Sequence, residues 1–293
     1  MVPVPPTVSI VVRSHNDIRF IRETLSMLLA QDFPDLEILS CDDASTDGTA
    51  ACIDEFSGIR KLSRPEGAYV PGRTLNIAVQ ACRGEIIVFN NADAVPCARE
   101  YISELVAPFF DPAVAAVYGN QLCREDATFL VRKDHERAFG DGILAARWGN
   151  FFSLASSAIR RQKLLQYPFS EKLQYSEDIE WAQRCRARGE KIAYAARAQV
   201  RHSHNYTLSQ LKKRFYNEGL ASAQIFAERQ SLMQCLGRIA METLRDFVWL
   251  LKRNAWREIP QAPLRRFAQK FSCYQGERDF FHTERVVNDA TQR

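Results

Sequence analysis

The chain has 293 residues, of which 46% are hydrophobic and 25% are charged. Such a composition excludes disordered, collagen-like and disulfide-scaffold proteins, and no apolar run approaches the roughly 20 residues that span a membrane. The first residues have neither the basic start nor the cleavage pattern of a secretory signal peptide. The eight cysteines form no CxxC pair, which favours reduced, buried thiols in a cytosolic protein.

The net charge of +4 is spread unevenly along the chain. Residues 201–293 hold 16 basic and 9 acidic side chains, whereas residues 1–200 hold 23 basic and 26 acidic ones. The basic excess therefore belongs to the last third of the chain. Either this part meets an anionic surface, or it has a solvated basic face.

Strand and helix patterns alternate over the first part of the chain. Short β-branched runs predict strands, and apolar residues three or four positions apart predict helices. The predicted strands are 8–13, 36–41, 59–62 and 85–89, and the predicted helices are 18–30, 49–56 and 75–82. Short connections between such elements favour a mostly parallel sheet with helices on both faces.

The pattern is weaker over residues 120–176, and the chain becomes mostly helical from Leu208 onward. Between these parts, the predicted elements are a helix at 179–188 and short strands at 191–195 and 199–202. In the helical part, an apolar stripe runs between Leu232 and Leu251 with arginines and lysines around it.

Three polar clusters follow predicted strands, at residues 13–17, 42–47 and 90–94. Ligands of parallel sheets bind beyond the carboxyl ends of the strands, so we expect the three clusters to gather at one edge. The motifs GxxxxGK[ST] and GxGxxG are both absent from the sequence. Their absence disfavours a nucleoside triphosphatase and a dinucleotide-dependent dehydrogenase.

Asp42 and Asp43 stand at the end of a predicted strand. Carboxylates in this place accept hydrogen bonds from ribose hydroxyls or from a base, although capping of the next helix is an alternative use. We favour nucleotide binding for Asp42 and Asp43, and helix capping for Asp47.

Asn91 and Asp93 follow the most apolar of the predicted strands. A hard divalent cation prefers oxygen ligands and takes one or two carboxylates together with substrate phosphates. One aspartate with one asparagine makes a weaker cation site than two aspartates, and Asn-x-Asp before a proline is also typical of a plain turn.

Glu177 and Asp178 lie at the start of a predicted helix, where the helix dipole favours carboxylates. The alternative is that one of them is a general base that removes a proton from a hydroxyl nucleophile. Residues 201–206 contain two histidines, one of them His202, which are either metal ligands or ordinary polar residues at a strand end.

Taken together and in this order, these segments resemble the family-2 glycosyltransferases of the GT-A fold over roughly residues 7–220. The segments are VSIVVRSHND, CDDASTDGT, NNADAVP, SEDIEWAQRCRARGEKI and VRHSH. Four further segments resemble one branch of this family more narrowly, the bacterial rhamnosyltransferases. They are YGNQL at 118–122, FFSLASSAIRR at 151–161, YPFSEKL at 167–173 and VRHSHNYTLSQLKKRF at 200–215.

The resemblance implies an α/β protein of the GT-A type, with a mostly parallel central sheet flanked by helices. It implies a catalytic domain over residues 1–206 and a helical C-terminal extension over residues 207–293. Among the candidate residues, those matching the family's nucleotide-sugar site are Arg13, Asn16, Asp42, Asp43, Arg73 and Asn91.

The resemblance also implies the chemistry of the remaining positions. Asp93 matches the metal-binding member of the family's Asp-x-Asp motif, and His202 matches a histidine that approaches the metal, expected to be Mg2+ or Mn2+. Asp178 matches the catalytic base, with Glu177 beside it. Most members have aspartate where this chain has Asn91, which lacks one negative charge.

The implied reaction is an inverting sugar transfer, with dTDP-rhamnose as the favoured donor and a glycan or lipid-linked glycan of the bacterial surface as acceptor. The alternatives are a UDP- or GDP-sugar donor, and a non-catalytic carbohydrate- or partner-binding protein on a decayed fold. A sugar nucleotidyltransferase is disfavoured because the first loop lacks glycine and lysine.

The basic, helical last third has three alternative uses. We expect a cytoplasmic protein whose C-terminal helices touch the inner face of the cell membrane, or pack on the catalytic domain, or join two copies of the chain. Nucleic acid is not an expected partner, because the basic residues match no recognised module and lack an interleaved aromatic pattern.

Overall fold

The computed structural model describes residues 7–291, with side chains up to residue 285, and the chain forms two compact units. The first unit holds the described residues up to 125 together with 135–172 and 177–203. The second unit holds 126–134, 173–176 and the described residues from 204 onward.

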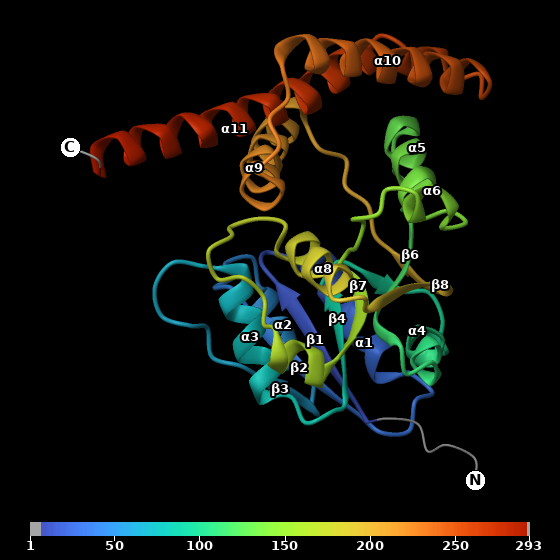
Figure 1. Ribbon diagram of the computed structural model, residues 1–293. Helices are drawn as coiled ribbons and strands as arrows, with labels where there is room; N and C mark the ends of the chain where they lie inside the picture. The colour runs from blue at the N-terminus through green and yellow to red at the C-terminus, as the bar shows by residue number, and fades with distance from the viewer. Residues whose placement is uncertain (1–6, 292–293) are drawn as a thin grey trace. The chain divides into compact units, whose positions relative to one another are not determined.

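Within the described residues, the first unit is built on an eight-stranded sheet with the order β3-β2-β1-β4-β7-β6-β8-β5 (Figure 1). The strands are β1 Val8–Ser14, β2 Leu36–Asp42, β3 Ile59–Lys61, β4 Ile86–Asn91, β5 Val95–Pro96, β6 Val114–Leu122, β7 Ser156–Arg160 and β8 Lys191–Arg201. Strands β5 and β7 run antiparallel to their neighbours, and the others run parallel. The prediction of a mostly parallel sheet is confirmed.

The helices of the first unit follow the predicted alternation. They are α1 Ile18–Leu29, α2 Thr49–Asp54, α3 Pro71–Ala81, α4 Tyr101–Val106, α6 Ile143–Ala146, α7 Arg161–Gln166 and α8 Glu177–Ala187, with a 3-10 turn at Ala107–Phe110. Helix α5, Phe129–Ala138, begins in the second unit and ends in the first. Helix α3 begins at Pro71, earlier than predicted, because a proline fits the first helical position, where no N–H is needed.

The two strands predicted at 191–195 and 199–202 are one strand, β8. Its pairing with β6 jumps from Ala195 opposite Gly119 to Gln199 opposite Asn120, so three residues of β8 have no counterpart on β6. A bulge of this kind breaks the side-chain alternation of a strand, which is why the sequence pattern shows two short strands instead of one.

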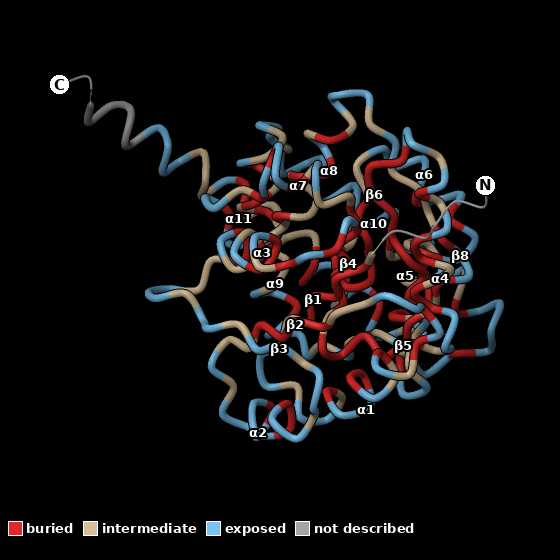
Figure 2. Tube along the Cα trace, turned by 90° about the horizontal axis from the view of Figure 1, so that it is seen from below, coloured by how far each residue is buried: buried red, intermediate tan, exposed pale blue. Residues whose placement is uncertain are grey.

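Alternate residues of the central strands face opposite sides of the sheet, and both sides are covered. Ile10 packs on the side of α1 and α4, whereas Val11 and Phe89 pack on the side of α3 and α8. Figure 2 shows the resulting run of buried residues along β1, β4 and β6. Such two-sided burial explains why these strands are continuous apolar runs.

Among the described side chains, the five most deeply buried cysteines are Cys41, Cys52, Cys82, Cys185 and Cys235, all of them free thiols. Burial in apolar surroundings raises the pKa of the Cys41 thiol to about 12 and that of Cys82 to about 11. These cysteines are therefore packing residues, as predicted.

The second unit consists mainly of α9 Leu208–Phe226, α10 Leu232–Leu251 and α11 Gln261–Thr291, with a 3-10 turn at Trp256–Glu258. Helix α9 starts with a capping box at Thr207, and α10 starts with a capping box at Ser231. Helix α11 packs against both other helices. None of the helical segments that the structure describes is long and apolar enough to cross a membrane.

Helices α9 and α11 approach closely at two glycines, and Gly219→Ala is expected to force them apart. A Cβ at Gly219 would lie 2.1 Å from the backbone oxygen of Cys273. Overpacking of this kind costs about 1–3 kcal/mol in the free energy of unfolding, measurable by denaturant titration. The matched control is Gly237→Ala on α10, where a Cβ would meet no described atom within 4 Å. There alanine should stabilise the helix by about 1 kcal/mol, and losses of equal size at both positions would contradict the close approach.

Candidate active site

Strands β1, β2 and β4 end side by side, which brings the three polar clusters together. Ser14 at the end of β1 is in register with Asp42 on β2, and Arg13 is in register with Asn91 on β4. The predicted gathering of these clusters at one edge of the sheet is confirmed.

Asp42 and Asn16 shape the loops at this edge. The Asp42 carboxylate accepts hydrogen bonds from the Ser14 hydroxyl at 2.7 Å, the Ser45 hydroxyl at 2.6 Å and the Ser45 N–H at 3.0 Å. Asn16 has φ +59°, a conformation that asparagine tolerates better than most residues, and its Oδ1 accepts from the Thr46 N–H at 2.8 Å. Both side chains thus hold the first and second strand-end loops against each other.

Asp47 binds N–H groups at helix starts, as we favoured, although the N-cap position of α2 itself is Gly48. Its Oδ1 accepts from the N–H of Thr49 at 3.0 Å, where α2 begins, and its Oδ2 accepts from the N–H of Ile18 at 3.0 Å, where α1 begins. One carboxylate therefore satisfies N–H groups at the starts of two helices.

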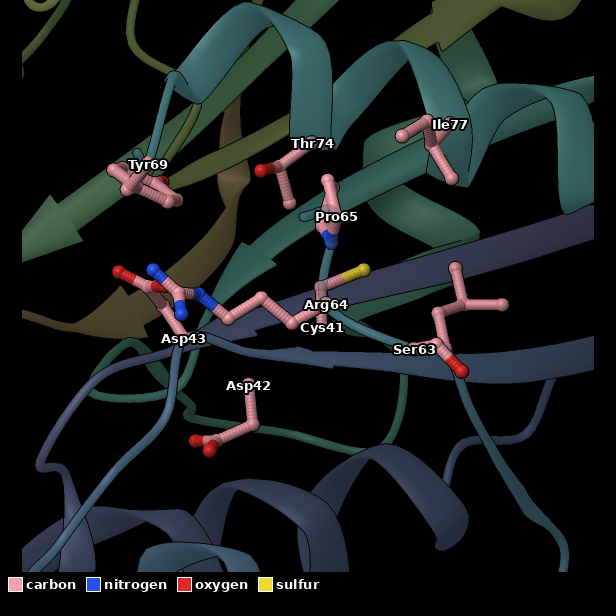
Figure 3. Close-up of a pocket in the computed structure, with 10 residues that line it drawn as sticks. Cys41, Asp42, Asp43, Ser63, Arg64, Pro65, Tyr69, Thr74 and Ile77 are labelled. Carbon is pink, nitrogen blue, oxygen red and sulfur yellow. The ribbon is translucent and has the colours of Figure 1, made fainter. Parts of the chain in front are cut away.

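Asp43 lines a hollow beside β2, and the lining also includes Arg64 and Tyr69 (Figure 3). The Nε of Arg64 donates to Oδ1 of Asp43 at 2.5 Å. Among the described residues, the lining of this hollow does not include Arg73. Arg73 lies exposed in the first turn of α3, and its Nη1 donates to the carbonyl oxygen of Glu66 at 3.2 Å.

Arg13 joins three elements of the first unit. Its Nη1 donates to Oε1 of Glu177 at 2.9 Å, and its Nη2 donates to Oδ1 of Asn91 at 3.3 Å. Glu177 is only 7% exposed, so the pair is largely shielded from water. The end of β1 is thereby held against the end of β4 and the beginning of α8.

Asp178 lies in the first turn of α8, next to this ion pair. Its Oδ1 accepts from the N–H of Ile179 at 2.9 Å, and its Oδ2 accepts from the N–H of Leu154 at 3.2 Å. Loss of solvent, together with the negative charge of Glu177, raises the pKa of Asp178 to about 6. A carboxylate of this pKa can accept a proton near neutral pH.

Asp93 and His202 come from different strand ends and meet in the first unit. The Nε2 of His202 lies 3.4 Å from Oδ1 of Asp93. On the other side of the ring, Nδ1 donates to Oε1 of Gln121 at 2.8 Å, and Nε2 of Gln121 donates to Ser153 at 2.9 Å. Because Nδ1 carries the proton, a neutral ring directs the Nε2 lone pair toward a carboxylate oxygen. A nitrogen and an oxygen placed in this way fit a bound divalent cation.

Two residues of this part of the site were not among the sequence candidates. Gln121 orients His202, and Arg124 lies beside Asp93, with its guanidinium 3.8 Å from Oδ2 of Asp93 and 3.8 Å from the centre of the Phe20 ring. Gln121 is part of the YGNQL segment in the rhamnosyltransferase resemblance, which was a signal that could have identified it.

A mixed sheet of this topology, with carboxylates beyond the ends of its parallel strands, is that of the GT-A nucleotide-sugar transferases. The family model described as "Glycosyltransferase like family 2" matches residues 5–217. The chain therefore belongs to this family of glycosyltransferases, and the predicted family and fold class are confirmed.

Two curated relatives are similar to most of this chain. The O-antigen chain rhamnosyltransferase RfbN of Salmonella typhimurium is 30% identical over 256 residues, which cover 83% of this chain and 80% of the relative. The O-antigen chain rhamnosyltransferase WbaN of Salmonella anatum is 29% identical over 250 residues, covering 81% of this chain and 78% of the relative.

Solved structures share the fold at lower sequence identity. The mannosyltransferase PcManGT of Pyrobaculum calidifontis, in complex with GDP-Man and Mn2+, is 18% identical with a TM-score of 0.61, covering 97% of this chain and 76% of that one. Glucosyl-3-phosphoglycerate synthase of Mycobacterium tuberculosis, in complex with Mn2+, UDP and phosphoglyceric acid, is 22% identical with a TM-score of 0.53, covering 70% and 73%.

The raised pKa of Asp178 predicts a pH-dependent effect of Asp178→Asn on stability. Between the ordinary pKa of 3.8 and the folded-state pKa of about 6, the unfolded chain loses this proton while the folded chain keeps it. The carboxyl group thus lowers the free energy of unfolding progressively as pH rises through this window. From pH 4 to pH 7, the free energy of unfolding of the variant should therefore rise by about 2 kcal/mol relative to that of the wild type. Denaturant titrations at both pH values measure it, and a pH-independent difference would contradict the raised pKa.

Proposed function

We propose that this protein transfers L-rhamnose from dTDP-rhamnose to a hydroxyl of a glycan, with inversion at the anomeric carbon and Asp178 as the base. The observation that carries the proposal is the environment of Asp178, a carboxylate with a raised pKa directly beside the Arg13–Glu177 ion pair. The donor is supported by the two relatives named as rhamnosyltransferases, which match about four-fifths of the chain.

The donor nucleotide would bind at the strand-end edge. Asp43 and Tyr69 offer a carboxylate and an aromatic ring in the hollow beside β2, suited to a ribose hydroxyl and a base. Asn16 and Asp42 would contribute by holding the loops in place, since their oxygens accept hydrogen bonds from neighbouring loop residues. Arg73 is proposed to contact the diphosphate, since its guanidinium is exposed and keeps further N–H donors beside the one bound to the carbonyl of Glu66.

Asp93 and His202 would hold Mg2+ or Mn2+, with the amide oxygen of Asn91 as a further neutral group at the same strand end. When bound, the cation offsets the negative charge that develops on the departing nucleoside diphosphate. Asn91 brings no negative charge, and Arg124 lies 3.8 Å from Asp93, so we expect modest metal affinity.

Asp178 would take the proton of the acceptor hydroxyl as its oxygen attacks the anomeric carbon. The new carbon–oxygen bond forms on the face opposite the diphosphate, whose own bond to the sugar breaks, so one displacement inverts the configuration. The charge of Glu177 helps to raise the pKa of Asp178, and Arg13 holds the Glu177 side chain in place. No covalent enzyme intermediate is needed.

The acceptor is proposed to be a lipid-linked glycan presented at the cytoplasmic side of the membrane. A relative from Escherichia coli, 31% identical over 114 residues, is named UDP-Glc:alpha-D-GlcNAc-diphosphoundecaprenol beta-1,3-glucosyltransferase WfgD. This match covers 39% of the present chain and 45% of the relative.

Asp178→Asn is expected to keep donor binding and to lose transfer. A positioned general base contributes roughly 10²–10⁴ in rate, and asparagine cannot accept the proton. Binding is measured by thermal shift with dTDP-rhamnose, and transfer by release of dTDP in the presence of a glycan acceptor. Near-normal turnover of the variant would remove Asp178 from the role of base.

The same thermal-shift measurement tests the donor when UDP-glucose, UDP-galactose and GDP-mannose are included. Stabilisation of the wild type by dTDP-rhamnose above the others is the expected result. A preference for a uridine or guanosine donor would overturn the rhamnose assignment while leaving the transferase intact. Absence of transfer and of donor hydrolysis with every donor would favour a non-catalytic binding protein.

Gln121→Ala is expected to weaken the binding of Mn2+ by about 10- to 100-fold, because His202 loses the partner that fixes its orientation. Titration of Mn2+ followed by electron paramagnetic resonance measures the free ion directly, without an activity assay. Asp93→Asn should weaken binding at least as strongly. Unchanged Mn2+ affinity in both variants, or full transfer activity after treatment with EDTA, would remove the metal from these residues.

A further inference from the structure

Helix α10 of the second unit is apolar on two sides, because Cys235 and Leu250 are fully buried while other apolar residues are exposed. Its inward side carries two carboxylates, of Glu242 and Asp246, which are 9% and 0% exposed. Its outward side is apolar, and Met233 and Leu244 there are 76% and 63% exposed. We define the outer face of α10 as Met233, Leu236, Met241, Leu244, Val248 and Leu251, all of which are exposed. An exposed apolar face of this length is typical of a surface that binds something.

Buried ion pairs fix this rotation of the helix. Asp246 accepts from Nε of Arg266 on α11 at 2.6 Å and from Nζ of Lys133 at 2.5 Å. Glu242 pairs within the same helix, accepting from Nη1 of Arg245 at 2.8 Å, so this pair turns with the helix. Turning α10 to bury its outward apolar residues would separate Asp246 from Arg266 and Lys133, and breaking a buried pair is strongly destabilising. The outer face therefore stays exposed within the second unit.

A row of positive charges runs along one edge of the outer face. Arg238, Arg245 and Lys252 are exposed and seven residues apart, and seven residues are close to two helical turns, so the three side chains lie nearly in line. The acidic residues of α10 are Glu242 and Asp246, both on the inward side. The exposed side of α10 is thus apolar along its centre and cationic along one edge.

We propose that the outer face of α10 binds the surface of a lipid bilayer that contains anionic headgroups. The apolar residues would enter the boundary between headgroups and acyl chains, and the basic row would meet the lipid phosphates. A second copy of the chain fits less well, because the outer face offers no acidic side chain to pair with the basic row of its partner. This surface is independent of the active-site assignment.

The test is flotation of the full chain with lipid vesicles. The protein is expected to float with vesicles of phosphatidylcholine and phosphatidylglycerol at low salt, and much less with phosphatidylcholine alone or at high salt. The double variant Met233→Gln/Leu244→Gln should lose this binding. Arg238→Gln/Lys252→Gln, which spares the Arg245–Glu242 pair, should lower the partition coefficient about fivefold for each charge removed.

Matched controls come from the first unit. Phe110→Gln removes an apolar side chain that is 67% exposed, and Arg60→Gln/Lys61→Gln removes two positive charges from the exposed strand β3. Both controls should float like the wild type, and thermal melting verifies that every variant is folded.

Three results would overturn the proposal. The first is no flotation of the wild type with anionic vesicles at low salt, and the second is flotation that survives the Met233→Gln/Leu244→Gln change. The third is a dimer in sedimentation experiments that the same change dissociates, which would assign the outer face of α10 to self-association. Because neither donor nor acceptor is used, failure here leaves the proposed reaction untouched, and failure of the reaction leaves this test unaffected.

Discussion

The arrangement of the first unit depends on one guanidinium, that of Arg13 at the end of β1. A largely shielded guanidinium requires a carboxylate partner, and Glu177, the first residue of α8, supplies it. The requirement fixes where α8 begins, and the beginning of α8 in turn fixes Asp178, one residue further along the chain. The position of the proposed base is thus a consequence of neutralising a charge at a strand end, and the Arg13 bond to Asn91 ties the Asn-x-Asp turn to the same point.

Charge also distinguishes the two halves of the site. Around Asp178, burial and the neighbouring Glu177 hold a proton on the carboxyl group to unusually high pH, which lowers the free energy of unfolding as pH rises from about 4 to about 6. Around Asp93, the carboxylate is flanked by Arg124 and by a neutral asparagine at position 91, and its negative charge helps to raise the pKa of Asp17. The charges of Arg124 and Asp17 thus oppose each other beside Asp93, whereas Asp178 lies next to a like charge.

The sequence predicts the parts of this protein that depend on local periodicity. Alternating burial in β1 and β4 is visible as continuous apolar runs, and the strand ends at Ser14, Asp42 and Asn91 follow from where those runs stop. The Gln121–His202 contact depends on the pairing of β6 with β8, whose bulge lies just before it, and no local pattern encodes that register. The loop role of Asp42 depends in the same way on Ser14, a residue 28 positions earlier in the chain.

Helix α10 shows why periodicity alone leaves the direction of an amphipathic helix open. An apolar stripe normally indicates the buried side, because burial of apolar surface is the dominant favourable contribution to folding. In α10, Asp246 on the inward side is paired with Lys133 and with Arg266, which also pairs with Asp134. Of the predicted apolar stripe, Leu250 is buried and Phe247 is half-buried, so the helix buries one apolar side and leaves the other, the outer face, exposed. The basic excess of the last third is therefore of two kinds: cations such as Arg266 that order the interior, and cations such as Arg238 that remain available at the surface.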